Sequence, residues 1–458
     1  MSLKTKWFED ARFGIFVHWG LYSIPAGVWN GQKMGRNWYS EWIRMQHDWP
    51  NPEGIPKEEY DTLLGQFNPE KFDADSWIAQ FKEAGAKYFL ITAKHHDGFA
   101  LWPSKVSKYN VVEATPFKRD VLGELKQACD KHGLELGFYY SHWQDWEHPG
   151  GALPPWPSRE NPHDPVKIQP SQEAFDVYWQ EKCLPQVREL IEDYDAKFFW
   201  FDSWADKPEL LLTEKRINQL IEVVRSASDQ CLINSRIGTT WCHSKGDTVV
   251  DYLSMGDNEF PDRKIARPWE TSGTFNHSWA CHKLDFNWKS SEQLLKHLVD
   301  NISRGGNFQL NVGPEADGTF GLPMVRRLKE IGGWLAANGE AVYQTSPVNL
   351  EEPEWGRIVK RDLVSGETRL YVHVYDWQSD DVVSMINGLH NEPLTACVLE
   401  TGQPVDVVKC DEGLGLVLPN ECTDERITVV AIDVKGEVAG YQAKDSDELN
   451  QPHSNFAF

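Results

Sequence analysis

The sequence predicts an α/β protein: a (β/α)8-like (TIM) barrel followed by a C-terminal antiparallel β-sandwich domain. From residue 13 to about 314, short apolar β-rich runs alternate with helical patterns, as expected for repeated βα units around a parallel sheet. Polar, chemically reactive residues follow nearly every predicted strand, and a (β/α)8 barrel builds its active site at the carboxyl ends of its strands. A doubly wound open sheet would gather such residues at one switch point, so the barrel is favoured.

The barrel elements follow from these alternating patterns. The predicted strands are Phe13–His18, Lys87–Ala93, Leu134–Tyr140, Lys197–Asp202, Cys231–Arg236, Val249–Ser254 and Asn307–Val312. The predicted helices are Asp73–Ala84, Val121–His132, Ser171–Tyr194, Glu214–Ala227, Ser291–Ser303 and Met324–Asn338, the last of which closes with Gly339. We therefore assign residues 1–345 to the catalytic barrel.

The pattern of apolar and polar residues changes after residue 345. Short alternating runs, separated by Gly, Pro, Asn and Asp, indicate a small sandwich over residues 346–440. The predicted strands there are Arg357–Lys360, Thr368–Tyr375, Val382–Ile386, Cys397–Leu399, Val405–Lys409, Leu414–Leu418 and Ile427–Ile432. Residues 441–458 are predicted to form a polar C-terminal tail.

Charge and composition exclude several classes of partner. The 458 residues include 69 acidic and 46 basic side chains, which gives a formal net charge of −23. Such a surface repels phosphate backbones and anionic lipid, so we expect no nucleic-acid partner and no membrane partner. The eight cysteines show no paired spacing and are predicted to be reduced, buried thiols. With no leader-like segment at Met1–Asp10, the expected location is the cytoplasm, or the periplasm or cell exterior if a leader was removed.

Aromatic residues are abundant, with 21 Trp, 21 Phe and 14 Tyr making up 12% of the chain. Core packing explains most of them. Many Trp residues stand beside His, Asp or Asn, however, and such mixed clusters suit a pyranose, which offers both apolar C–H faces and hydroxyl groups. The composition therefore favours a carbohydrate ligand.

Two motifs carry candidate chemistry. Asp202 ends a strongly apolar strand between Trp200 and Trp204, where its carboxylate could act as a glycosidase nucleophile, although a helix cap is the alternative. The pair His95-His96 follows another strand. These side chains diverge on a strand, and the chain has no His-x-His or His-Glu-x-x-His pattern, so hydrogen bonds to ligand hydroxyls are favoured over a metal site or a structural role.

The ordered set of motifs resembles the α-L-fucosidases of glycoside hydrolase family 29, from residue 7 to about 346. The matching segments are Trp7–Gly20, Glu41-Trp42, Thr92–Phe99, Lys118–Asp120, Trp200–Asp202, Trp269–Thr271, Gly305–Asn307, Asn311–Pro314 and Asp317-Gly318. The resemblance implies a barrel with a C-terminal sandwich, no cofactor and no metal. It also implies a retaining, exo-acting enzyme that removes terminal α-L-fucosyl residues from fucosylated oligosaccharides or polysaccharides. The sequence leaves open whether the protein forms a homo-oligomer.

The resemblance also assigns roles to individual residues. It makes Asp202 the nucleophile, and it assigns sugar binding to His18, Glu41, Trp42, His95, His96, Tyr140, Trp200 and Arg236, with Trp279 near the methyl group or the aglycone. Arg236 also follows a predicted strand, so it could keep Asp202 ionised, donate to hydroxyls or form an ordinary salt bridge.

The general acid/base stays open between three residues. Relatives carry it on the loop after the strand that ends at Ser254, which favours Glu259 and then Asp257. Glu270, in a stiffer stretch beside Pro268, is the third candidate. Two other classes of function remain: a fucose-binding protein without catalysis, and a metal-dependent amidohydrolase on the same fold. Linkage preference is not readable from the sequence.

Overall fold

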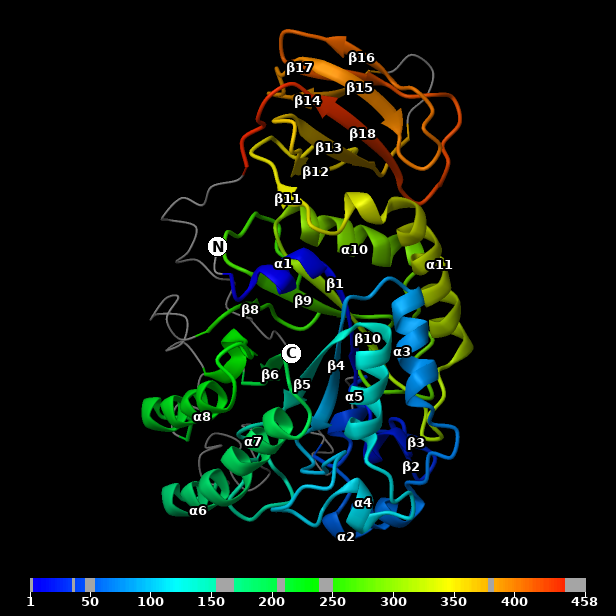
Figure 1. The fold of residues 1–458 in the computed structure, drawn as a ribbon. Coiled ribbons are helices and arrows are strands. Elements are labelled where there is room, and N and C mark those ends of the chain that lie inside the picture. Colours follow the sequence, from blue (N-terminus) through cyan, green and yellow to red (C-terminus); the bar gives the residue numbers. More distant parts are fainter. Residues whose placement is uncertain are drawn as a thin grey trace, which may run out of the picture.

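The computed structural model describes residues 3–34, 38–45, 54–153, 169–203, 211–238, 250–377 and 383–440. Eight parallel strands form the larger sheet, in the order β7-β6-β5-β4-β1-β10-β9-β8 (Figure 1). Their bounds are β1 Phe13–Val17, β4 Tyr88–Lys94, β5 Glu135–Tyr140, β6 Phe198–Phe201, β7 Leu232–Ile233, β8 Leu253–Ser254, β9 Trp269–Thr274 and β10 Asn307–Val312. A parallel bridge between Asn234 and Tyr252 joins the β7 end of this order to the β8 end, so the sheet closes into the predicted barrel.

Helices cover the outside of the barrel. They are α3 Ala74–Glu83, α5 Val121–His132, α6 Gln172–Tyr178, α7 Leu184–Glu192, α8 Glu214–Ala227, α10 Ser291–Ser303 and α11 Leu322–Asn338. Several begin at the side-chain caps expected from sequence: Asp73, Asp120, Thr213 and Ser290 each accept a hydrogen bond from a backbone N–H in the first turn. The predicted helix Ser171–Tyr194 is one continuous rod in which a π-helical turn, η5 (Trp179–Cys183), joins α6 to α7.

Short elements complete the barrel domain. They are α1 Lys6–Ala11, η1 Leu21–Ser23, β2 Val28–Trp29, β3 Gln32–Lys33, η2 Ser40–Trp42, α2 Lys57–Tyr60, η3 Asp61–Gln66, α4 Val111–Ala114, η7 Ser235–Ile237 and η9 Gly339–Ala341. Most of those between β1 and α5 lie at the carboxyl ends of the barrel strands, whereas α1 lies at the opposite end (Figure 1).

Side chains alternate across the barrel wall. Phe16, Tyr88, Tyr139 and Trp200 come from four strands and pack together in one cluster with Leu232, which places them inside the barrel. Their sequence neighbours on the same strands pack instead against the helices, in the larger core. Because a strand turns successive side chains to opposite faces, Asp202 continues the inward row of Phe198 and Trp200 at the carboxyl end of β6.

One barrel strand was not predicted. Strand β9 has the sequence Trp-Glu-Thr-Ser-Gly-Thr, and every residue of it is buried. The polar residues of this strand are hydrogen-bonded inside the barrel. Glu270 accepts from Ser254 and Gln309, and the Ser272 hydroxyl donates to Gln309. The pattern lacks the apolar run that marks a buried strand, so sequence reasoning passed over it.

The second domain consists of two antiparallel sheets. A five-stranded sheet has the order β11-β12-β13-β18-β15, and a three-stranded sheet has the order β14-β17-β16. The strands are β11 Ser346–Pro347, β12 Gly356–Asp362, β13 Thr368–Val374, β14 Val383–Asn387, β15 Pro393–Val398, β16 Asp406–Lys409, β17 Gly413–Val417 and β18 Thr428–Val434. Apolar side chains from both sheets form a separate core, which confirms the predicted sandwich. The tail predicted for 441–458 lies outside the described residues.

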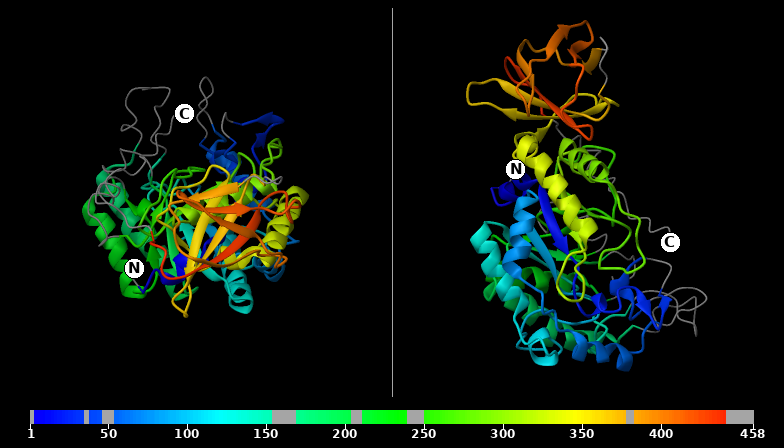
Figure 2. Two further views of the ribbon diagram at one scale, coloured as in Figure 1. Left: turned by 90° about the horizontal axis from the view of Figure 1, so that it is seen from above. Right: turned by 90° about the vertical axis from the view of Figure 1, so that its right-hand side faces the viewer.

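The sandwich sits on the end of the barrel that carries α1, away from the carboxyl ends of the strands (Figures 1 and 2). Helices α10 and α11 form the contact: Trp334 Nε1 donates to the Ile427 carbonyl at 2.8 Å, and Arg357 pairs with Asp300 at 2.8 Å. In the part of the chain that the structure describes, no helix is long and apolar enough to cross a membrane, and the seven cysteines found there are unpaired.

Candidate active site

Asp202 is the centre of a buried cluster at the carboxyl ends of the strands. The Tyr139 hydroxyl donates to its Oδ2 at 2.7 Å, His96 Nε2 lies 3.7 Å from the same oxygen, and Arg236 Nη1 lies 3.6 Å from Oδ1. Burial raises the pKa of the Asp202 carboxyl to about 6; Arg236 and the Tyr139 hydroxyl oppose that rise, and the charge of Asp257 adds to it. Asp202 Oδ1 is buried and accepts no hydrogen bond from any described residue.

Arg236 connects two carboxylates. It follows β7 on the short η7 turn, where its guanidinium lies over the Trp200 ring at 4.5 Å. The same Nη1 that faces Asp202 donates to Asp257 Oδ1 at 3.1 Å. Because both contacts use one nitrogen atom, the oxygen atoms of Asp202 and Asp257 are no further apart than the sum of these two distances. Arg236 is thus an ionic bridge within the site rather than a surface salt bridge.

His18 and His96, which follow β1 and β4, each donate a hydrogen bond from Nδ1 to a defined partner. Asn311 Nδ2 donates to the Trp279 carbonyl, so its Oδ1 must accept from His18 Nδ1, 2.6 Å away. Likewise the Ser141 hydroxyl donates to the Gln144 carbonyl and therefore accepts from His96 Nδ1 at 2.6 Å.

Burial favours the neutral form of both imidazoles. Burial lowers the pKa of His18 to about 3 and that of His96 well below its usual value. With Nδ1 carrying the single proton, each ring leaves Nε2 as an acceptor. A sugar hydroxyl is the natural donor for such a nitrogen atom.

His95 and three tryptophans supply the remaining surface of the cluster. The His95 ring stacks on Tyr139, with centroids 5.2 Å apart and planes 5° apart, and its Nδ1 has no protein partner among the described residues. Trp200 stacks on the other side of Tyr139 at 5.6 Å, Trp279 lies 5.3 Å from the His18 ring, and Trp42 packs edge-on against His96 at 4.9 Å.

Glu41 joins the cluster from η2, on the connection between β1 and α3. Its Oε2 accepts from the Ala280 N–H at 3.3 Å, and its side chain is only 2% exposed. Burial raises the pKa of Glu41 to about 8, and the charges of Asp257 and Asp202 act in the same direction. Burial therefore favours the protonated form of the Glu41 carboxyl, which can donate a hydrogen bond.

Tyr140 is not part of this cluster. Its hydroxyl donates to Gln186 on α7 at 2.8 Å, on the helix side of the barrel wall. The alternation of β5 turns its neighbour Tyr139 inward to Asp202 instead. Tyr139 was not among the predicted site residues. The alternation of side chains along β5 identifies it only once it is known which residues of that strand face the inside of the barrel.

The three acid/base candidates lie in different surroundings. Asp257 is bridged to Asp202 by Arg236, and the Tyr39 hydroxyl lies 3.5 Å from its Oδ2. Glu259 turns back on its own loop, where its Oε2 accepts from the Gly256 N–H at 3.1 Å, and burial raises its pKa. Glu270 is fully buried inside the barrel and accepts from Ser254 and Gln309, so the structure does not bring it to Asp202.

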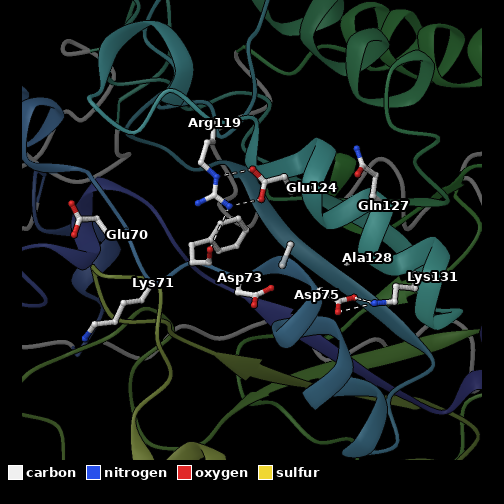
Figure 3. A pocket seen from close by; sticks show the side chains of 11 residues that line it. Glu70, Lys71, Asp73, Asp75, Arg119, Glu124, Gln127, Ala128 and Lys131 are labelled. Atoms are coloured by element: carbon white, nitrogen blue, oxygen red, sulfur yellow. Dashed lines mark hydrogen bonds and ion pairs between the residues drawn. The ribbon is translucent and has the colours of Figure 1, made fainter.

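The cluster is not arranged as a metal centre. Within the described ranges, no three His, Cys, Asp or Glu side chains gather as potential metal ligands. A separate groove of about 770 Å³ lies on the barrel surface between α3 and α5 (Figure 3). Within it Arg119 pairs with Glu124 and Lys131 with Asp75, and none of its lining residues belongs to the Asp202 cluster.

Comparisons with known proteins agree with this geometry. The family model described as "Alpha-L-fucosidase" matches residues 2–340. The alpha-L-fucosidase of Dictyostelium discoideum is 28% identical over 438 residues, which cover 92% of this chain and 87% of that protein. The structure of an alpha-L-fucosidase GH29 from Bacteroides thetaiotaomicron has a TM-score of 0.81 and 30% identity, and covers 95% of this chain and 96% of that one.

A second structure of an alpha-L-fucosidase GH29 from that organism is a trapped covalent intermediate with 2-fluoro-fucosyl fluoride. It has a TM-score of 0.79 and 30% identity, and covers 95% of this chain and 97% of that chain. The family match spans well over half of the chain and includes every strand of the barrel. The chain therefore belongs to the alpha-L-fucosidase family.

Proposed function

We propose that this protein is a retaining, exo-acting α-L-fucosidase that hydrolyses terminal α-L-fucosyl residues of fucosylated glycans, with Asp202 as its nucleophile. One observation carries the assignment of Asp202: its carboxylate ends an inward row on β6, receives the Tyr139 hydroxyl, and faces a second carboxylate across Arg236. Retaining glycosidases have their two carboxyl groups about 5–5.5 Å apart, and the carboxylates of Asp202 and Asp257 both lie within 3.6 Å of the same guanidinium nitrogen atom.

The reaction proceeds in two displacements. Asp202 attacks the anomeric carbon and forms a fucosyl ester, while the acid/base residue protonates the departing glycosidic oxygen. The same residue then removes a proton from water, which attacks the anomeric carbon and releases fucose and the Asp202 carboxylate. The covalent intermediate trapped in the Bacteroides thetaiotaomicron relative supports this route.

Asp257 is our choice for the acid/base, in place of Glu259, which the sequence favoured. Its carboxyl group faces the nucleophile across Arg236, whereas the Glu259 carboxylate is engaged by the Gly256 N–H of its own turn. The charge of Asp257 acts on Asp202, Glu41 and Glu259 alike, so the choice rests on the contacts of the two carboxyl groups. Geometry is the first criterion for a general acid, and it favours Asp257.

The remaining residues of the cluster bind the sugar. His18 and His96 accept hydroxyl protons at Nε2, and protonated Glu41 donates to a sugar oxygen. Trp200 and Trp279, which both pack on Phe16, supply the apolar part of the cluster, and we assign to them the contacts with the C–H bonds and the methyl group of fucose. We propose no metal in this reaction, because the Nδ1 atoms of His18 and His96 are engaged and, among the described residues, no carboxylate completes a ligand set with them.

A substrate screen combined with proton NMR tests this proposal. We expect hydrolysis of an aryl α-L-fucoside, with the α-anomer of fucose formed first, and no hydrolysis of an aryl β-galactoside. Hydrolysis of the galactoside alone, or release of the β-anomer first, would refute a retaining fucosidase.

A pair of matched variants tests the acid/base. Asp257→Ala should lose most activity on a natural fucosyl disaccharide, retain first-step activity on an activated aryl fucoside, and recover turnover in azide. Glu259→Ala should change the activity on either substrate by no more than about threefold, a difference of under 1 kcal/mol in transition-state stabilisation. The opposite pattern in the two variants would return the role to Glu259.

A further inference from the structure

A second group of charges lies behind the active-site cluster, entirely out of solvent. Lys94 and Lys182 each place Nζ 2.9 Å from Asp145 Oδ2, and the three side chains are 0%, 3% and 0% exposed, respectively. Burial would raise the pKa of Asp145, but the two ammonium groups outweigh it and hold that pKa well below its usual range. We call these three residues the Asp145 clamp. Buried charges are costly, so such a clamp calls for a functional explanation.

Two departures from regular geometry aim the lysines at Asp145. The pairing of β4 with β5 shifts register between Thr92 and Lys94, which is the signature of a β-bulge. Without the bulge, Lys94 would continue the inward row of Tyr88, Leu90 and Thr92; with it, the ammonium group passes over the Tyr140 ring on the helix side.

The second departure is in the helix that carries Lys182. The π-helical turn η5 occupies Trp179–Cys183 and inserts an extra residue between α6 and α7. Such turns re-aim side chains and concentrate at functional sites. Lys182 points inward from this turn, and its second partner is Glu147, at 3.0 Å from Nζ.

Asp145 in turn fixes the loop that follows β5. Its Oδ1 accepts from the backbone N–H groups of Glu147 and His148 at 3.3 and 2.9 Å. Gly98 makes this possible, because a Cβ atom at that position would lie 2.6 Å from Asp145 Oδ1.

The next residue along this loop touches the sugar-binding cluster. The Trp146 N–H donates to the His96 carbonyl at 2.8 Å, and its ring packs 5.5 Å from the His96 ring and 5.3 Å from the Trp42 ring. Arg44, two residues beyond Trp42, donates to the Trp146 carbonyl at 2.6 Å. The loop held by Asp145 is therefore continuous with the wall formed by His96, Trp42 and Trp146.

We propose that the Asp145 clamp positions this wall for fucose binding, so that Lys94, Asp145 and Lys182 are positioning residues of the enzyme. The inference rests on the proposed function, since it takes His96 and Trp42 as sugar-binding groups. In this arrangement the lysines hold Asp145, Asp145 holds the turn at Trp146, and Trp146 sets the places of His96 and Trp42.

Lys182→Met tests the clamp, because methionine keeps the length of the side chain and removes its charge. We expect the dissociation constant for L-fucose, measured by calorimetry, to rise about tenfold, with a similar rise in KM on an aryl α-L-fucoside and a kcat within about threefold of the wild type, as for lost ground-state binding. Leu190→Ala is the matched control: Leu190 is fully buried on α7 and belongs to the large apolar core. It should lower Tm and leave both constants unchanged.

The outcomes separate the two proposals. A wild-type protein that neither binds L-fucose nor cleaves the fucoside would refute the proposed function. A wild type that does both, with Lys182→Met lowering Tm but not changing fucose affinity, would overturn the clamp.

If Lys182→Met does not fold, Tyr178→Phe carries the same test. Its hydroxyl accepts from Lys94 Nζ at 3.1 Å and donates to the His142 carbonyl at 3.0 Å, so its loss removes one of the contacts that position Lys94, while the ion pair with Asp145 keeps the buried charge partnered. We expect fucose affinity to fall about threefold; an unchanged affinity would overturn the clamp as well.

Discussion

The hydrogen bond from Tyr139 to Asp202 makes a quantitative prediction about the pH dependence of catalysis. Tyr139→Phe removes a donor 2.7 Å from the carboxylate and keeps the ring that stacks on His95 and Trp200. A hydrogen bond to a charged group contributes about 1.5–3 kcal/mol, and one pKa unit corresponds to about 1.4 kcal/mol. The pKa of Asp202, about 6 in the wild type, should therefore rise by about one to two units in the variant.

The pH profile of kcat/KM on an aryl α-L-fucoside measures this shift. The nucleophile must be ionised, so activity falls as the pH drops through the pKa of Asp202 in the free enzyme. We expect the acid limb of the profile to move to higher pH in Tyr139→Phe and much of the loss to be recovered on the alkaline side.

Tyr140→Phe is the matched control for this experiment. It removes the neighbouring hydroxyl, which bonds to Gln186 on the other face of β5. We expect a lower Tm, because a buried acceptor loses its donor, and an acid limb at the wild-type pH. An unmoved limb in Tyr139→Phe, or a shifted limb in Tyr140→Phe, would refute the geometry that we assign to the nucleophile.

Three further predictions concern charge and metal. Burial raises the pKa of Glu270 to about 8. The contribution of protonated Glu270 to stability is complete below the pKa of this residue in the unfolded chain, and it is lost as the pH rises through about 8. Glu270→Gln should therefore flatten the fall in Tm between pH 5 and 8, and an unchanged slope would contradict this. Arg236→Met should lower kcat/KM by at least about a hundredfold, since it leaves Asp202 and Asp257 facing each other without a cation; a loss under tenfold would remove Arg236 from the site. Dialysis against a chelator should leave activity intact, and recovery on addition of a divalent ion after a loss would show a metal requirement.

Much of the barrel could be predicted because its strands carry strong patterns. Both faces of β6 are apolar up to Asp202, and β10 alternates apolar Phe308, Leu310 and Val312 with polar residues between them. Strand β9 was missed for the opposite reason. Its buried Glu270 is hydrogen-bonded to residues of neighbouring strands inside the barrel, and the local sequence pattern does not predict such contacts.

The site was predicted less completely than the fold. Most residues assigned to it by resemblance lie in one cluster around Asp202, but the choice between Tyr139 and Tyr140 depended on the parity of β5, and a shift of one residue reverses the face of a strand. The choice between Asp257 and Glu259 depended on the path of a loop after β8, where two acidic residues two positions apart turn to different partners. Tertiary contacts, rather than sequence, separate such candidates.

Covalent trapping of the enzyme tests the central claim, that Asp202 is the nucleophile of a retaining α-L-fucosidase. The protein is incubated with 2-fluoro-fucosyl fluoride, its intact mass is recorded, and the modified peptide is sequenced by tandem mass spectrometry. We predict one fluorofucosyl group per chain, attached to Asp202, and no adduct on Asp202→Ala under the same conditions. An adduct on another carboxylate, or no adduct on a protein that turns over an aryl α-L-fucoside with net inversion, would contradict it.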